Sequence, residues 1–298
     1  MAHPLVFVQA MLDATGVADC VVACEGLRMA ASSNSELVLA SDGPSAIVFA
    51  LTAHAGSAAA CKAGCAALVN ITANNAGGSA ACVAAGAPAV VVAALTTHVG
   101  VAAVCEKGCL ALCNIAVSDA GGAACVAAGA PAAVIAALTT HAGDAVVCEM
   151  GCWALALIAC SNAGSAACVA AGAPAAVVAA LTTHAGEAAV CGKGCVALIN
   201  MCYCDAGETA CIAAGASMAL LAALATHAGL ESVCLHAAWA LLYITGSNSA
   251  QLSAIKALGV APRLAEELVR EAATFPFARA KAHAALEALG FSESGVKK

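Results

Sequence analysis

The chain alternates apolar segments with short breaks of glycine, proline or polar residues, and Gly100–His141 shows this pattern most clearly. The breaks divide each copy into three parts. We predict a short helix at Ala123–Ala128, a second at Pro131–Thr140, where proline suits the first helical turn, and a longer third helix at Asp144–Ala159. No stretch alternates polar and apolar residues as a strand does, and the high alanine content favours helix. The pattern therefore predicts an all-α chain.

The same pattern returns about every 43 residues, with a histidine at the end of each copy. Five such histidines are 44, 43, 43 and 43 residues apart: His54, His98, His141, His184 and His227. A proline stands ten residues before each of the first four, and Ser217 takes this place before the fifth. A fixed period of this length is typical of solenoids, in which each repeat buries its apolar faces against its neighbours. We predict one solenoid over residues 1–298.

Less regular copies flank the regular ones. Residues 1–31 lack the opening short helix and are predicted to form an N-terminal partial repeat, whereas residues 32–247 are the regular repeats. After Pro262 the sequence becomes charged, so residues 248–290 are predicted to form a degenerate repeat and residues 291–298 a tail. Terminal repeats need a polar outer face because no neighbour covers it, and we therefore interpret both ends as caps.

Composition limits both the interior and the partners. Only 3% of the residues are aromatic although 63% are apolar, so the interior must consist largely of Ala, Val, Leu and Cys. Such small side chains predict closely spaced helices. The net charge is -7 and only 10% of the residues are charged, whereas nucleic-acid binding requires clustered Lys and Arg. We therefore expect no nucleic acid as the main partner.

The apolar segments raise the question of membrane insertion. Ala123–His141 has 19 residues without a charge, but Gly129-Ala130-Pro131 interrupts it, and alanine contributes little to insertion. We expect no membrane span, and association of the apolar surface with a membrane stays an alternative. The N-terminal residues show no basic segment and no cleavage site after a long apolar core, so we expect no secretory signal. A cytoplasmic location is predicted, with the nucleus as the alternative.

Nineteen cysteines recur at matching places of successive copies. A reduced cysteine behaves as a small apolar residue that is often buried, so we interpret these residues as packing positions. The alternative is metal or redox chemistry. Cys105, Cys109 and Cys113 are spaced four apart, on one face of a helix, and a histidine or a fourth thiolate could complete a tetrahedral zinc site. Short zinc motifs usually place their ligands two apart across a tight turn, which favours packing.

The order of the segments resembles the armadillo repeat over essentially the whole chain. The strongest matches are the third-helix sequences Cys109-Leu-Ala-Leu-Cys-Asn-Ile115, Trp153-Ala-Leu-Ala-Leu-Ile158 and Trp239-Ala-Leu-Leu-Tyr-Ile244. HEAT repeats, which are two-helix units of similar length, are the nearest alternative. The resemblance implies a right-handed α-solenoid of three-helix repeats, with five clear copies between degenerate terminal caps.

The resemblance also implies a concave groove lined by the third helices, in which a Trp and an Asn four residues later hold the backbone of an extended peptide. An Asn amide offers a donor and an acceptor to a main chain, and a Trp offers a flat apolar wall. This chain separates the two residues. Asn70, Asn114 and Asn200 follow Ala66, Leu110 and Val196, whereas Trp153 and Trp239 precede Leu157 and Tyr243. A nuclear-import-type peptide adaptor is therefore kept only as an alternative.

Charges of both signs lie one turn before the Trp place, and they do not form an acidic trough for a basic peptide. A solvated face is the alternative to a role in partner contact, although solenoids usually bind their partners on the concave face. The residues predicted to contact a partner in the groove are Lys62, Asn70, Glu106, Lys107, Leu110, Asn114, Glu149, Met150, Trp153, Lys193, Asn200, His236, Trp239 and Tyr243.

The sequence offers no catalytic motif. The repeated histidines lie at the predicted end of the second helix, where an imidazole can bond the last free carbonyls of that helix. Catalysis would need a positioned nucleophile or carboxylate beside them, and the Ala-Ala-Gly-Ala-Pro segments lack the Lys-Ser/Thr of a nucleotide loop. We therefore expect no enzyme, no cofactor and no bound metal. The predicted function is a non-catalytic scaffold or adaptor for a protein or peptide segment.

Overall fold

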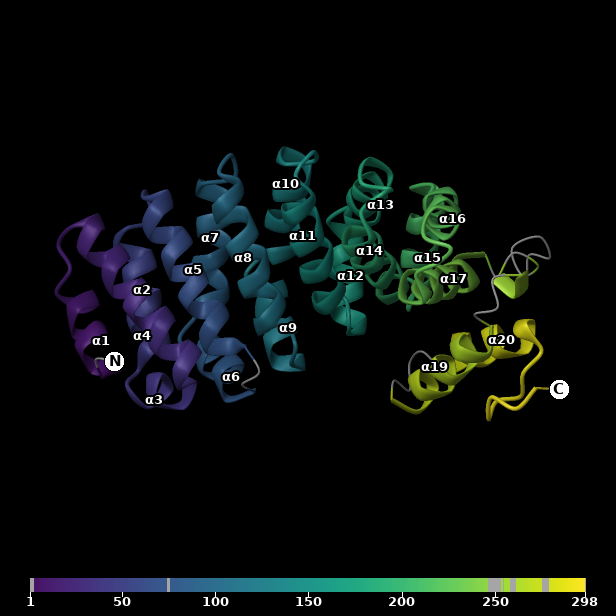
Figure 1. The fold of residues 1–298 in the computed structure, drawn as a ribbon, viewed down its shortest axis with the longest axis horizontal. Coiled ribbons are helices and arrows are strands. Elements are labelled where there is room, and N and C mark those ends of the chain that lie inside the picture. Colours follow the sequence, from purple (N-terminus) through teal and green to yellow (C-terminus); the bar gives the residue numbers. More distant parts are fainter. Residues whose placement is uncertain are drawn as a thin grey trace. The chain divides into compact units, whose positions relative to one another are not determined.

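The computed structural model describes residues 3–73, 76–245, 253, 255–257, 261–274 and 279–297 (Figure 1). Apart from an isolated antiparallel bridge between Phe291 and Lys297, the regular structure of these residues is helical, which confirms the predicted all-α fold. The chain divides into two compact units, Met1–Ile158 and Ala159–Lys298. A single solenoid over residues 1–298 stays a prediction, and its predicted boundary at residues 247 and 248 lies outside the described residues.

The N-terminal unit is built from repeats of a short first helix, a second helix and a long third helix. In chain order its helices are α1 (Pro4–Leu12), α2 (Val17–Ser33), α3 (Ser35–Ala40), α4 (Gly43–Ala53), α5 (Ala58–Thr72), α6 (Ala76–Ala84), α7 (Ala87–Thr97), α8 (Ala102–Ile115), α9 (Asp119–Ala127), α10 (Ala130–Thr140) and α11 (Ala145–Ile158). Helices α1 and α2 take the places of a second and a third helix, and residues 1–31 as an N-terminal partial repeat stay a prediction.

The C-terminal unit continues the same order for two repeats and then changes. Its helices are α12 (Asn162–Ala170), α13 (Ala173–Thr183), α14 (Ala188–Met201), α15 (Asp205–Ala213), α16 (Ala216–Thr226), α17 (Glu231–Thr245), α19 (Ala261–Thr274) and α20 (Arg279–Leu289). Helices α19 and α20 pack mainly against each other, and each makes a smaller contact with α17.

Helix α9 starts earlier than the sequence analysis predicts, at Asp119 instead of Ala123. The Ser118 side chain accepts a hydrogen bond from the Gly121 backbone N–H at 3.1 Å and so caps the helix. Gly121 and Gly122 lie in the first turns of α9, where glycine in the sequence indicated a break before the helix. A Cβ atom at Gly121 would lie 1.7 Å from the Ile115 carbonyl oxygen, so glycine is required there by close packing and does not end a helix.

The long third helix α11 also starts one residue later than predicted. Asp144 lies just before it, and its Oδ1 atom accepts hydrogen bonds from the Val146 and Val147 backbone N–H groups at 3.0 and 3.2 Å. The carboxylate therefore caps the free N–H groups at the helix start, where the helix dipole also favours a negative charge.

Second helices begin after a left-handed turn. Gly129 has φ of 79° immediately before α10, and glycine adopts this conformation without the strain that a side chain would bring. Pro131 follows inside the first turn of α10, as predicted, because the missing N–H is not needed there. In the first complete repeat Asp42 takes the same turn with φ of 56°. The turn thus separates the first and second helices of each complete repeat.

Neighbouring third helices form the centre of each unit. Helices α2, α5, α8 and α11 pack side by side in the N-terminal unit, and α14 packs on α17 in the C-terminal unit. Most of the largest fully buried side chains of the complete N-terminal repeats lie on these helices: Leu68, Ile71, Leu112, Ile115, Leu155 and Ile158. The interior consists of aliphatic side chains, as the composition predicts.

A glycine on the third helix lets the second helix approach closely. A Cβ atom at Gly108 would lie 2.6 Å from the Cδ2 atom of Leu95, which is fully buried on α7. Gly64, Gly151 and Gly194 make the equivalent contact with Leu51, Leu138 and Leu181. The predicted close spacing of helices is therefore confirmed at a specific pair of positions in each of these repeats.

The repeated histidines connect neighbouring repeats. As predicted, they stand at the ends of second helices, and the His98 backbone N–H donates to the Ala94 carbonyl. The predicted ring bond to the same helix is wrong. The Nε2 atom of His98 lies 2.8 Å from the Ala55 carbonyl oxygen, and that of His141 lies 2.7 Å from the Val99 oxygen, each in the preceding repeat.

Serines connect the first helix and the third helix of one repeat. In the N-terminal unit the buried Ser79 hydroxyl donates to the Ile115 carbonyl oxygen at 2.9 Å, and in the C-terminal unit Ser165 donates to the Met201 oxygen at 3.1 Å. Both carbonyls end a third helix, where the helix itself provides no donor. Each serine therefore satisfies a free backbone group at the end of the third helix of its own repeat.

Within the described residues, no single helix is long and apolar enough to cross a membrane. Four pairs of consecutive helices reach that length and composition together, but each is bent by 73–76° at its break.

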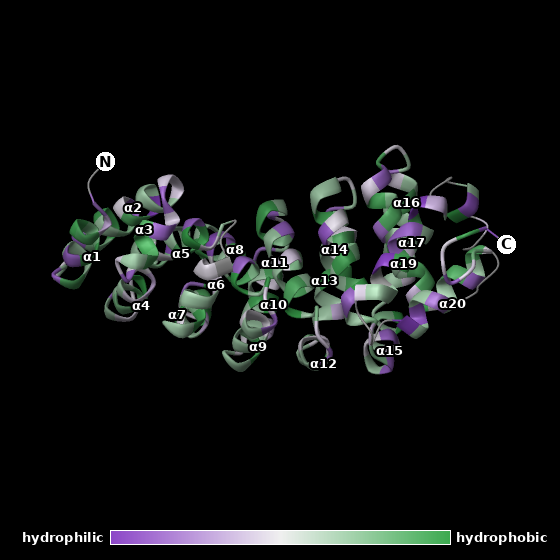
Figure 2. Cartoon of the chain, turned by 90° about the horizontal axis from the view of Figure 1, so that it is seen from below, coloured by the Kyte–Doolittle hydropathy of each residue, from purple (hydrophilic) through white to green (hydrophobic). Residues whose placement is uncertain are grey.

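Figure 2 shows the pale to green colour of second helices such as α7 and α10 and the purple segments of α19 and α20. The three second helices α7, α10 and α13 contain no charged residue.

We predict that Gly108→Ala lowers the free energy of unfolding by about 1–3 kcal/mol, because the added methyl group overpacks the contact with the buried Leu95. Urea denaturation followed by circular dichroism measures the change. Gly143→Ala is the matched control, since a Cβ atom at this exposed turn meets nothing within 4 Å. Equal stability of the two variants would contradict the proposed role of the glycine–leucine contact.

Candidate partner-binding surface

Partly exposed side chains at matching positions of α2, α5, α8 and α11 follow one another along the N-terminal unit, and we call them the third-helix row. They are Glu25, Lys62, Ala66, Asn70, Glu106, Lys107, Leu110, Asn114, Glu149, Met150, Trp153 and Leu157. Lys62 is exposed and the others are half-buried. The row contains all of the partner-contact residues that the sequence analysis predicts in this unit. Which of them contact a partner stays a prediction.

The two asparagines of the third-helix row already hold neighbouring helices together. Asn70 Nδ2 donates to the Arg28 carbonyl at 3.0 Å, and Asn114 Nδ2 donates to the Val69 carbonyl at 3.2 Å. The Oδ1 atom of each has no hydrogen-bond partner among the described residues. Each amide therefore uses a donor inside the protein, and its acceptor stays without a bond to the described residues.

Charges along the third-helix row alternate in sign and are partly paired. Glu106 and Lys107 form an ion pair at 2.6 Å, and each side chain is 30% exposed. Lys62 forms no ion pair with the described residues. An ion pair this exposed contributes little to stability, so breaking it to pair either side chain with another charge costs little free energy. The row is neither an acidic nor a basic trough.

In the C-terminal unit the equivalent positions hold a cluster of aromatic rings. Tyr243 packs edge to face against Trp239, with ring centroids 6.3 Å apart, and against Tyr203 at 6.4 Å. Tyr243 is only 4% exposed, and Asn200 is 6% exposed and donates to the Cys160 sulfur at 3.2 Å. These two predicted contact residues therefore offer almost no surface in this structure.

Two buried polar atoms of this cluster have no hydrogen-bond partner among the described residues, Nε1 of Trp239 and Nδ1 of His236. Burial lowers the pKa of His236 below its ordinary value, the Glu267 carboxylate raises it, and the nearby Lys193 ammonium lowers it further. The imidazole is therefore held toward its neutral form. Lys193 is half-buried.

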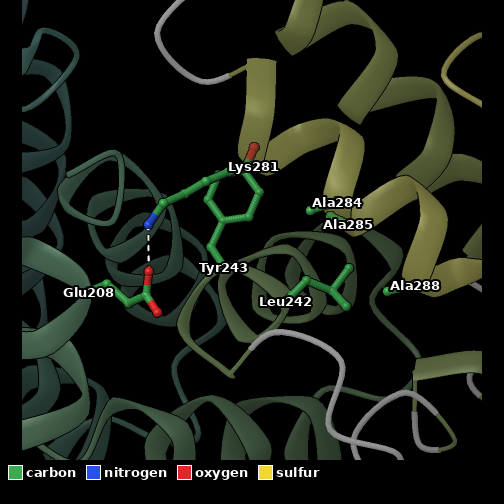
Figure 3. Close-up of a pocket in the computed structure, with 7 residues that line it drawn as sticks. All are labelled: Glu208, Leu242, Tyr243, Lys281, Ala284, Ala285 and Ala288. Carbon is green, nitrogen blue, oxygen red and sulfur yellow. Dashed lines mark hydrogen bonds and ion pairs between the residues drawn. The ribbon is translucent and has the colours of Figure 1, made fainter. Parts of the chain in front are cut away.

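Helix α20 also contacts earlier helices of the C-terminal unit, which was not predicted from the sequence. Lys281 Nζ donates to the Glu208 carboxylate at 2.6 Å and to the Cys202 carbonyl at 2.7 Å (Figure 3). A cavity of about 180 Å³ lies beside this ion pair, lined by Glu208, Leu242, Tyr243, Lys281, Ala284, Ala285 and Ala288. From the sequence, Lys281 was interpreted only as one of the charged residues of the C-terminal cap. No sequence pattern connects it with Glu208.

The cysteines are free thiols, and all except the half-buried Cys160 and Cys204 are buried. Burial raises the pKa of Cys65, Cys82, Cys125 and Cys168 to about 12 from an ordinary value of 9.0. A thiol held in its neutral form is a poor nucleophile and a poor metal ligand. The burial agrees with the interpretation of these cysteines as packing residues.

The predicted alternative of a zinc site involves Cys105, Cys109 and Cys113. The Cys105 thiol instead donates to the Val99 carbonyl oxygen at 3.3 Å, and Cys109 and Cys113 are buried. Among the residues that the structure describes, no three His, Cys, Asp or Glu side chains are grouped so that they could hold a metal ion.

Comparisons with known proteins identify the repeat. No protein-family model and no curated protein sequence matches the chain. The designed armadillo repeat protein YIII(Dq)4CqI is similar, with a TM-score of 0.70, 24% identity, and 82% of this chain and 100% of that chain covered. Computationally designed armadillo repeat proteins for modular peptide recognition are similar with a TM-score of 0.69 and 25% identity, and again 82% of this chain and 100% of that chain are covered. A designed armadillo repeat protein in complex with the peptide (KR)4 is similar with a TM-score of 0.56 and 21% identity, and 97% of this chain and 100% of that chain are covered.

Helix-turn-helix-turn-helix repeats that bury their third helices against one another define an α-solenoid scaffold. Within this class the repeats have the armadillo fold, because the superposition on designed armadillo repeat proteins covers most of the chain. The armadillo resemblance predicted from the sequence is therefore confirmed.

We predict that the protein loses stability as the pH rises from about 9 toward about 12. The folded state keeps the thiols of Cys65, Cys82, Cys125 and Cys168 neutral to about pH 12, whereas unfolded thiols ionise from their ordinary value of 9.0. Their stabilisation is complete below pH 9, and above it each thiol lowers the free energy of unfolding by about 1.4 kcal/mol per pH unit.

Urea denaturation at pH 8, 9 and 10 measures this loss, and thiolate absorbance at 240 nm reports ionisation. A chain with Cys160→Ala and Cys204→Ala removes the two half-buried thiols from the signal. Thiolate absorbance that rises near pH 9 while the helicity stays native would contradict the prediction.

Proposed function

We propose that the chain is a non-catalytic scaffold that binds a peptide or protein segment along the third-helix row of its N-terminal unit. The observation that carries this proposal is the pair of amide acceptors on Asn70 and Asn114, which are half-buried, in matching positions and unpaired. An extended segment has one backbone N–H per residue to offer to such acceptors. The armadillo fold supports the proposal because it is a scaffold fold with a peptide-binding groove, generally without catalytic activity.

The partner segment is expected to combine apolar side chains with charges of both signs. Leu110 and Trp153 provide apolar walls, while Lys62 and the Glu106–Lys107 pair provide charges of opposite sign nearby. A solved designed relative binds the wholly basic peptide (KR)4. The third-helix row lacks the uniform negative charge that such a peptide needs, so we do not propose a basic import signal as the ligand. A cytoplasmic location of the scaffold is part of the proposal.

Selection of a displayed library of random peptides on the full chain tests this function. We expect peptides to be enriched, and the variant Asn70→Ala/Asn114→Ala to bind them about tenfold or more weakly. Each lost amide hydrogen bond is worth about 1 kcal/mol, and 1.4 kcal/mol corresponds to a factor of ten. Trp153→Ala should weaken binding through lost contact area.

The matched control is Thr96→Ala/Thr139→Ala. These exposed threonines lie on α7 and α10 and donate to carbonyls of their own helices at 2.8 Å. This control should bind the peptides as the unchanged chain does. Thermal midpoints are compared because the asparagine amides also connect helices. Peptides that bind all variants equally would contradict the proposed surface.

A further inference from the structure

Helix α20 reaches past α17 to the preceding repeat of the C-terminal unit. Figure 3 shows Lys281 extending from α20 toward Glu208 of α15, with Tyr243 of α17 beside it. The same ammonium group donates to the Cys202 carbonyl at 2.7 Å, just after the end of α14. A carboxylate and a helix-terminal carbonyl together form a site for a cation. Lysine therefore anchors α20 to a surface made by α14, α15 and α17.

This surface is only partly filled. Ala284, Ala285 and Ala288 of α20 line the cavity of about 180 Å³ opposite Leu242 and Tyr243. Lysine and the three alanines are at positions i, i+3, i+4 and i+7, which lie on one helical face. Alanine side chains are too short to fill the cavity, so it has room for larger apolar side chains at these positions.

The neighbouring aromatic cluster is also left unsatisfied. Trp239 packs on Tyr243, which lines the cavity, and no described residue accepts a hydrogen bond from Trp239 Nε1. His236 Nδ1 is likewise buried without a partner near Glu267 of α19. Buried polar atoms without hydrogen bonds raise the free energy of the folded state. Helices α19 and α20, which contact α17, therefore leave space beside it for a helix with larger side chains.

We propose that the surface formed by Glu208, the Cys202 carbonyl, Leu242 and Tyr243 is a helix-binding site, which α20 occupies within the chain and a partner helix can take over. The partner helix carries a lysine one turn before a face of apolar side chains larger than alanine. This inference rests on the proposed scaffold function and assigns it a second surface with a different type of ligand.

The test uses a fluorescein-labelled synthetic peptide of residues 277–291 with Leu in place of Ala284 and Ala288, titrated against the full chain and followed by fluorescence polarisation. Lys281→Met in the chain removes the anchor of α20, so we expect this chain to bind the peptide at least tenfold more tightly than the unchanged chain. Lys281→Arg keeps a cation and should behave like the unchanged chain. Lys256→Met is the matched control, because Lys256 is exposed and forms no ion pair with the described residues.

A second variant keeps the test decisive if loss of Lys281 disturbs folding. Ala288→Glu in the chain places a carboxylate in the apolar wall and should also release α20 and tighten peptide binding. In a Trp153→Phe background, Trp239 is the only tryptophan, so acrylamide quenching of its fluorescence should increase in both released variants and decrease when the peptide is added. A released chain that binds the peptide no more tightly than the unchanged chain would overturn the proposal.

The peptide itself provides the final control. Replacing its lysine by methionine should abolish binding, and unchanged binding would show that Glu208 and the Cys202 carbonyl do not recognise it. Asn70→Ala/Asn114→Ala should leave binding of this peptide unchanged, because those residues belong to the third-helix row of the N-terminal unit. The helix-binding site and the proposed peptide-binding row can therefore fail independently.

Discussion

Contact between a glycine and a leucine in four of the repeats, at Gly64, Gly108, Gly151 and Gly194, allows the second and third helices to pack at the short distance that an alanine-rich interior requires. At Gly108 and Leu95 the available space is smaller than one methyl group. With only 3% aromatic residues, the chain has few large side chains to fill a wider gap between helices. Buried cysteines and alanines can fill the interior only because the helices lie so close together. The repeat therefore depends on small residues at fixed positions more than on large apolar anchors.

Polar residues of the repeat serve mainly to join one repeat to the next. The rings of His98 and His141 and the amide of Asn114 each contact a backbone carbonyl of a neighbouring repeat. Such carbonyls at helix ends and in turns have no donor of their own and would otherwise need water. Recurrence of a polar residue in a repeat protein thus has a structural explanation before a functional one. The asparagines join neighbouring helices through the amide donor, and the proposed partner contact uses the amide acceptor.

The two units present different surfaces to a partner. In the N-terminal unit the third-helix row is open, with mixed charges and unpaired amide acceptors. In the C-terminal unit Tyr243 and Asn200 are buried, and α20 covers part of α17 through Lys281. The same repeat can therefore provide an open surface for an extended segment and a closed one that a helix of the chain itself occupies.

The spacing of His, Pro and Gly was sufficient to predict the helical repeat and the segment order, because these residues act on the backbone near their own positions. Helix starts at Asp119 and Ala145 were missed by a few residues, since Gly121 is needed for packing and Asp144 for capping. The sequence placed Asn70, Asn114 and Trp153 on third helices, but only the tertiary structure showed which amide atoms are engaged. It also decided the partners of the His98 ring and of Lys281, about 43 and 73 residues away. Those contacts arise from how repeats stack, and no local pattern of side chains records them.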